Sequence, residues 1–127
     1  MESILFLVGR ILFGGVFLFF GMNHFKNKKN MIEYAKSKNI GAPALANFMA
    51  GLVLILSGIL IILGIFPDVA LVLLIIFLFT VSIVMHDFWT IKDENEKAMQ
   101  MIHFMKNMAL LGGSLMLIWL NNWPLSF

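Results

Sequence analysis

Four long runs of apolar residues alternate with polar segments along this chain, and they cover residues 4–22, 45–66, 69–86 and 102–120. A helix needs about 20 apolar residues to cross roughly 30 Å of hydrocarbon, because each residue advances it by about 1.5 Å. Lipid offers no hydrogen bonds to an open backbone, so helices are favoured there. The pattern predicts an all-α membrane protein, a bundle of four transmembrane helices with residues 1–127 as a single transmembrane domain.

The polar segments predict how these runs are connected. Residues 31–38 place Met31, Tyr34 and Ala35 on one helical face and most of their charges on the others. This arrangement is typical of a short interfacial helix between spans one and two, and a plain solvated loop is the alternative. The other connections are predicted to be a tight turn at 65–68 and a charged loop at 90–97.

The composition supports a membrane location. Apolar residues make up 61% of the chain and charged residues 13%, whereas a soluble domain has roughly a quarter charged residues. This balance excludes a disordered chain and a soluble nucleotide-binding domain. The isoelectric point of about 9.1 therefore does not indicate a nucleic-acid partner, and the lipid bilayer is the expected surrounding.

The lysines predict the orientation of the chain in the membrane. Seven of them lie in the two long polar segments, and the termini and the middle turn have neither lysine nor arginine. The positive-inside rule then places the long loops in the cytoplasm and both termini outside. The expected location is a prokaryotic cell membrane, in which this would be a multi-pass protein. These lysines are expected to set the topology and meet anionic lipid, with a specific acidic partner as the alternative.

Arg10 is a charged residue inside the first apolar run, where a charge costs about 2.5 to 3.5 kcal/mol. Its helical face continues through Gly14, Phe17 and Gly21, and the two glycines would let another helix approach closely. Arg10 is predicted either to extend toward the headgroups or pair with Asp68, or to bind an anionic or quinone-type headgroup.

Polar groups from all four apolar runs converge on the lysine-bearing end of the predicted bundle. His103, Lys106 and Asn107 share one helical face, since they are spaced i, i+3 and i+4. Such a cluster has the groups to hydrogen-bond a quinone carbonyl or relay a proton, and equally to satisfy each other and the helix ends. The candidate binding residues are Asn23, His24, His86, Asp87, Trp89, His103, Lys106 and Asn107, with Arg10 as a second candidate site.

No metal or intrinsic cofactor is predicted. The chain has no cysteine, which excludes disulfides and thiolate metal sites. Haem ligation by His86 and His103, and copper ligation by methionine and histidine, are minor alternatives. Phosphate-loop, dinucleotide, zinc-protease and serine-hydrolase motifs are missing. Catalytic residues stay unassigned, and whether the chain is an enzyme is left open.

Several short motifs, taken in their order and spacing, resemble the DoxX family of small four-span membrane proteins. The resemblance implies a four-helix bundle associated with membrane redox complexes, such as the DoxD-type subunit of thiosulfate:quinone oxidoreductase. Two positions depart from it: Leu54 stands where glutamate is frequent, and His24 where lysine is common. The motifs are Gly9-Arg10, Gly21-x-x-His24-Phe25, Gly41-Ala42-Pro43-Ala44, Ala50-Gly51-Leu52-Val53, Ser57-Gly58 to Gly64, His86-Asp87-Phe88-Trp89 and residues 106–113.

Two main functional hypotheses follow. The first is an integral subunit of a quinone-linked oxidoreductase, whose polar cluster meets a quinone headgroup or a redox partner subunit. The second is a non-enzymatic bundle that binds lipid or a small apolar ligand, or that scaffolds a complex. Transport is a third possibility, for which a homo-oligomer would have to supply more than four spans.

Overall fold

The computed structural model describes residues 2–120 and 122–127, and this part of the chain is all-helical. The predicted fold class is therefore confirmed as far as its helical character goes. The elements are α1 (Glu2–Lys26), α2 (Lys28–Ser37), α3 (Pro43–Leu63), α4 (Pro67–Met85), the short 3₁₀ helix η1 (Phe88–Thr90) and α5 (Glu94–Leu117).

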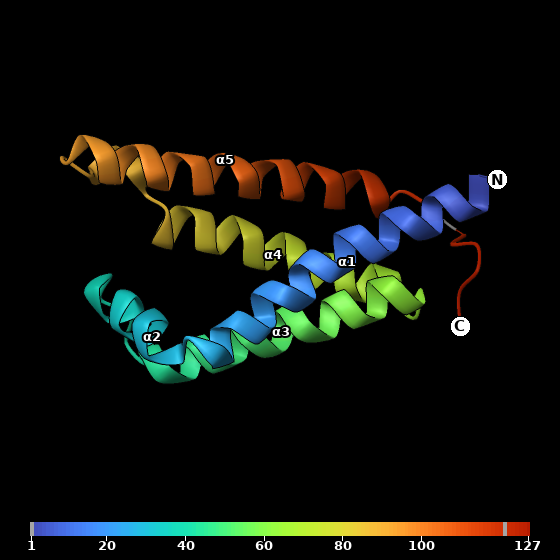
Figure 1. Cartoon of the computed structure of the whole chain (residues 1–127), viewed down its shortest axis with the longest axis horizontal. Helices are drawn as coiled ribbons and strands as arrows, with labels where there is room; N and C mark the ends of the chain where they lie inside the picture. Colours follow the sequence, from blue (N-terminus) through green and yellow to red (C-terminus); the bar gives the residue numbers. More distant parts are fainter. Residues whose placement is uncertain (1, 121) are drawn as a thin grey trace.

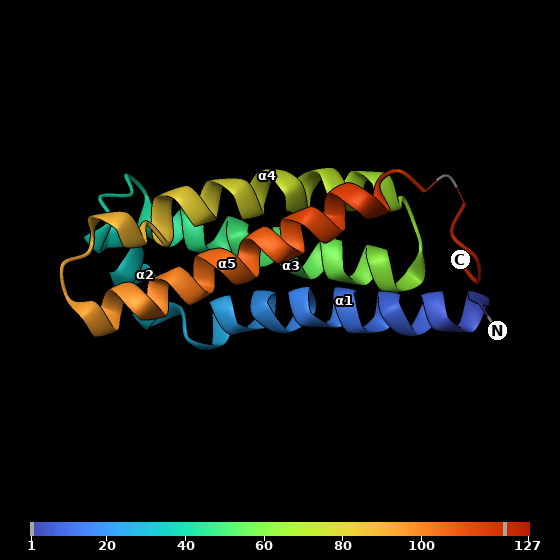
Figure 2. The same ribbon diagram turned by 90° about the horizontal axis from the view of Figure 1, so that it is seen from above.

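The four long helices form two pairs. The helix α1 packs mainly on α3, and α4 packs mainly on α5, while α3 and α4 join the pairs. Figure 1 shows the pairs close together near the chain termini and diverging toward α2, and Figure 2 shows the same helices from above. The bundle thus has a closed end beside the termini and a wider end beside α2.

Glycines set the close approach of α1 and α3. A Cβ atom added to Gly58 would lie 2.6 Å from the Gly14 carbonyl oxygen, and one on Gly21 would lie 2.9 Å from that of Gly51. Both distances are too short for a side chain, so the backbones touch at two points seven residues apart on each helix. Small residues are the usual means of such contact between membrane helices.

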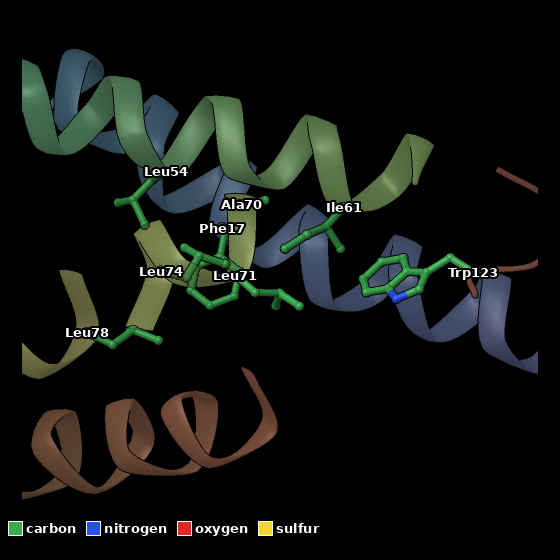
Figure 3. Packing of buried hydrophobic residues seen from close by; sticks show 8 residues of the cluster. All are labelled: Phe17, Leu54, Ile61, Ala70, Leu71, Leu74, Leu78 and Trp123. Carbon is green, nitrogen blue, oxygen red and sulfur yellow. The ribbon is translucent and has the colours of Figure 1, made fainter. Parts of the chain in front are cut away.

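The buried core lies between the two pairs. The residues buried on α1 are Arg10, Gly14, Phe17 and Gly21, which confirms the helical face predicted from the sequence. Figure 3 shows Phe17 beside residues of α3 and α4, with the indole of Trp123 filling the end next to the termini. The core side chains are Phe17, Leu54, Ile61, Ala70, Leu71, Leu74, Leu78 and Trp123.

Large apolar side chains cover the outside of the helices. Leu12 and Phe19 on α1 are 66% and 68% exposed, and similar residues project from α3, α4 and α5. Three segments of the described residues, Glu2–Lys26, Pro43–Leu63 and Pro67–Thr90, are long and apolar enough to cross a membrane. Most of the fourth predicted span, 102–120, lies in α5, which is more polar and is not among these three.

The start of α5 differs from the sequence prediction. Residues 94–97 were expected to be loop, yet α5 begins at Glu94 because the Asp93 side chain caps it, accepting a hydrogen bond of 2.9 Å from the Glu96 backbone N–H. Acidic residues in the first turn also interact favourably with the helix dipole. The predicted charged loop is therefore wrong in its second half, and α5 ends at Leu117 instead of 120.

The turn between α3 and α4 covers residues 64–66, so it overlaps the turn predicted at 65–68, and α4 begins two residues earlier than predicted. Gly64, with φ of 71°, ends α3 in the left-handed conformation that glycine adopts without strain. Pro67 starts α4, where its fixed φ suits a first helical position.

We predict that Gly58→Ala destabilises the protein by about 1–3 kcal/mol, since the new methyl group separates α1 from α3. Gly15→Ala is the matched control, because a Cβ atom there meets nothing within 4 Å. Thermal unfolding in detergent, followed by circular dichroism, checks this. Equal melting temperatures for the two variants would contradict the proposed contact.

Candidate functional site

A cavity of about 890 Å³ opens between the helix pairs toward the α2 end. Its walls are mostly apolar and include Leu54, Leu73 and Phe77. Polar side chains gather at its wider end, contributed by all five helices and by His86 just after α4. They are Asn23, His24, Asn30, Tyr34, Asn47, Thr80, His86, Glu96, Gln100, His103, Lys106 and Asn107.

The α5 part of this lining follows from helical periodicity. Gln100, His103 and Asn107 lie on one face, and Gln100 and Asn107 are nearly buried at 6% and 4% exposure. The ammonium group of Lys106 lies 4.4 Å from the centre of the Phe20 ring on α1, a favourable cation–π contact. Positive charge and hydrogen-bonding groups thus face an otherwise apolar cavity.

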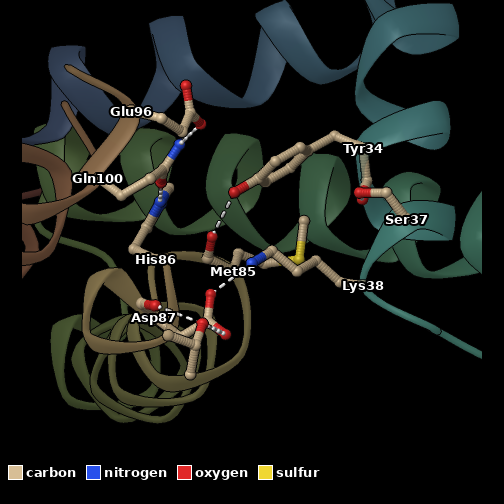
Figure 4. Close-up of polar contacts among 9 residues, drawn as sticks. Tyr34, Ser37, Lys38, Met85, His86, Asp87, Glu96 and Gln100 are labelled. Atoms are coloured by element: carbon tan, nitrogen blue, oxygen red, sulfur yellow. Dashed lines mark hydrogen bonds and ion pairs between the residues drawn. The ribbon is translucent and has the colours of Figure 1, made fainter. Parts of the chain in front are cut away.

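His86 and His103 come together, as predicted from their equal depth in the bundle. Their ring centres are 5.2 Å apart, with the planes inclined by 32°. The Nδ1 atom of His86 lies 2.7 Å from Oε1 of Gln100, and the Gln100 amide donates a 3.1 Å hydrogen bond to the Glu96 carboxylate (Figure 4). These contacts hold the His86 ring in one position.

The helix α2 is tied to the end of α4 by two contacts, both drawn in Figure 4. The Tyr34 hydroxyl donates a 2.7 Å hydrogen bond to the Met85 carbonyl oxygen, which has no partner within its own helix. Lys38 forms an ion pair with Asp87. Burial raises the pKa of the Tyr34 hydroxyl, and the hydrogen bond to Asp87 raises the pKa of the Lys38 ammonium group.

On the opposite wall, two polar side chains hydrogen-bond to backbone carbonyl oxygens of α1. The His24 ring shares a 2.9 Å hydrogen bond with the Phe20 carbonyl oxygen, and Asn47 donates one of 2.8 Å to the His24 carbonyl oxygen. These two side chains therefore bond to backbone and not to each other.

Of the eight predicted cluster residues, six line the cavity: Asn23, His24, His86, His103, Lys106 and Asn107. Asp87 and Trp89 do not line it. Asp87 pairs with Lys38, while Trp89 is half exposed and packs edge-on against Phe88 and Phe104. The helix α4 ends at Met85, so these two side chains no longer follow its periodicity.

Tyr34 and Gln100 are cavity residues that the predicted site did not include. Gln100 precedes His103 by three residues, so helical periodicity already places it on the face shared by His103 and Asn107. Tyr34 lies on the apolar face of α2, where a residue is expected only to pack. Its hydroxyl group, which can form a hydrogen bond, is the signal that could have identified it.

Arg10 corrects a sequence-based prediction. It is only 2% exposed, so it does not extend toward the headgroups, and Asp68 is an exposed residue outside its hydrogen bonds. Its guanidinium group donates to the carbonyl oxygens of Ile62 at 2.9 Å, Leu125 at 3.0 Å, and Pro124. Arg10 therefore fastens the C-terminal tail to the end of α3. Backbone carbonyls, which a sequence pattern does not reveal, take the place of the expected acid.

Comparison with known proteins agrees with the architecture. The DoxX family matches over residues 5–87, roughly two thirds of the chain. This chain belongs to the DoxX family. It is 28% identical over 116 residues to inner membrane protein YphA of Escherichia coli (strain K12), an alignment that covers 91% of this chain and 82% of YphA. No solved structure matches it.

The family match and the long apolar helices make this an integral, multi-pass membrane protein. The matched region includes the cavity residues up to His86 but ends before α5. The contributions of Gln100, His103, Lys106 and Asn107 are therefore established by the structure of this chain alone.

We predict that Arg10→Met destabilises the folded protein by about 1.5–3 kcal/mol, since hydrogen bonds from a charged group to several carbonyls are lost. The tail should also be cleaved faster by added protease. Gly9→Ala, the neighbouring position with open space, serves as control. Unchanged stability and tail protection in Arg10→Met would show that the tail is held by other contacts.

Proposed function

We propose that this chain is an integral subunit of a quinone-linked oxidoreductase complex and that its cavity receives the quinone headgroup. The observation that carries this proposal is the shape and chemistry of the cavity: about 890 Å³, apolar along its walls and polar at one end. Pockets for small ligands are typically mostly apolar with a few placed polar groups.

A membrane quinone has matching chemistry, with a flat headgroup bearing two carbonyl oxygens and an apolar tail. His103, Lys106 and Asn107 supply hydrogen-bond donors at the polar end of the cavity. The walls formed by Leu54, Leu73 and Phe77 suit the tail. The chain has no cysteine for a thiol relay, so we assign the electron carrier to a partner subunit.

We further propose that α5 is a fourth span and that α2 lies in the headgroup layer. The α5 helix runs antiparallel along α4 (Figure 2) and exposes Ile102, Met105 and Met116 on its outer surface. In α2 the lysines are exposed, whereas Tyr34 is half-buried and Ala35 is buried. With the lysines inside, the α2 end faces the cytoplasm and the termini face outward.

A lipid or another small apolar ligand is the second candidate occupant. The predominance of apolar walls favours it, because an acyl chain would fill the same space. Such an occupant would fit the non-enzymatic alternative, in which the bundle binds lipid or scaffolds a complex. The identity of the bound molecule separates the two candidates.

We predict that protein purified in mild detergent retains quinone, detected by solvent extraction and mass spectrometry. Lys106→Met should lower the retained amount roughly tenfold, because a charged hydrogen-bond donor at the headgroup is lost. Lys97→Met, which changes the same residue type on α5 outside the cavity lining, should retain the wild-type amount.

Two results would contradict this assignment. Equal quinone content in wild type, Lys106→Met and Lys97→Met would place the binding elsewhere. Phospholipid without quinone in the extract would favour the lipid-binding alternative.

A further inference from the structure

The hydrogen bonds of His86 form a directional chain that begins at a carboxylate. Glu96, in the first turn of α5, accepts a 3.1 Å hydrogen bond from Nε2 of Gln100. Oε1 of Gln100 then lies 2.7 Å from Nδ1 of His86. Gln100 is only 6% exposed, so its amide is oriented by these two neighbours.

This chain determines which ring nitrogen of His86 carries the proton. An ionised carboxylate only accepts hydrogen bonds, so the side of the Gln100 amide that faces Glu96 must be the NH₂ group. The other side, which faces His86, is then the carbonyl oxygen, also an acceptor. A 2.7 Å contact between this oxygen and Nδ1 requires a proton on Nδ1. Neutral His86 therefore has an unprotonated Nε2.

The lone pair of Nε2 is available to a ligand. None of the described residues forms a hydrogen bond with Nε2, and His86 lines the cavity. The His103 ring lies beside it, with the ring centres 5.2 Å apart and the planes inclined by 32°, which limits the rotation of the His86 ring. The polar end of the cavity thus presents a hydrogen-bond acceptor at His86 beside the donors of Lys106 and Asn107.

We propose that His86 selects the reduced, hydroxyl-bearing quinol over the oxidised quinone, with Gln100 and Glu96 as positioning residues. A quinol hydroxyl donates a hydrogen bond to Nε2. A quinone carbonyl oxygen at the same place cannot, because it and Nε2 are both acceptors. The inference rests on the proposed function, and it names the redox form that the site holds more tightly.

The test measures binding of duroquinol and duroquinone to wild-type protein in lipid nanodiscs by calorimetry, without oxygen and at mildly alkaline pH, where an ordinary imidazole is neutral. We expect the quinol to bind roughly tenfold more tightly, the value of about one hydrogen bond. In Glu96→Gln the preference should fall toward equality, because an amide at 96 donates or accepts and no longer orients Gln100.

The matched control is Glu94→Gln, which removes the same charge from the same helical turn at an exposed position. It should keep the wild-type preference. Nitrogen-15 NMR of the His86 ring gives a second readout that does not depend on ligand: a proton on Nδ1 in wild type and Glu94→Gln, and a mixture of both tautomers in Glu96→Gln.

The outcomes separate the two proposals. Equal binding of quinol and quinone to wild type, or a proton on Nε2 of His86, would overturn the selection by His86 while leaving the quinone site in place. Binding of neither form would overturn the quinone site and the selection together.

Discussion

The close contact between α1 and α3 is the constraint on which the rest of the structure depends. Gly14 meets Gly58 and Gly21 meets Gly51 with backbone in contact, so these two helices stay together along most of their length. The helices α4 and α5 form a second pair that joins the first mainly through α3 and α4. The pairs diverge toward α2 (Figure 1). An apolar cavity lies between them, and its polar groups are at the wider end.

Polar groups have different surroundings at the two ends of the bundle. Beside the termini, the two terminal nitrogens of the buried Arg10 donate to carbonyl oxygens of α3 and the tail. Nε of Arg10 and Nε1 of Trp123 are buried there without a partner among the described residues. At the α2 end, His103, Lys106 and Asn107 face a cavity. Backbone carbonyl oxygens thus offset much of the cost of burying Arg10 at one end, and a ligand can offset the cost of burying Asn107 at the other.

Much of this arrangement is readable from the sequence, because long apolar runs joined by short polar segments leave few alternatives to a helical bundle. The convergence of His86 with His103 followed from the similar number of residues that two neighbouring spans need to cross the membrane, and the glycine face of α1 followed from its spacing. The start of α5 was also encoded, since Asp93 followed by Glu96 resembles a helix-capping pattern. The partners of Arg10 could not be predicted from the sequence, because they are backbone carbonyl oxygens, which every residue has. Asp87 and Trp89 lie outside the cavity lining because the helical periodicity of α4 stops at Met85.

The central claim is that the space between the helix pairs holds the quinone. The most direct test is to fill that space with a larger side chain. Val53 lines the cavity, whereas Leu56, on the same helix, is 54% exposed on the outer surface. The measurement is the quinone content of purified Val53→Trp and Leu56→Trp proteins with unchanged helix content. The account predicts that Val53→Trp loses the bound quinone and Leu56→Trp keeps it, and equal quinone content in the two variants would contradict it.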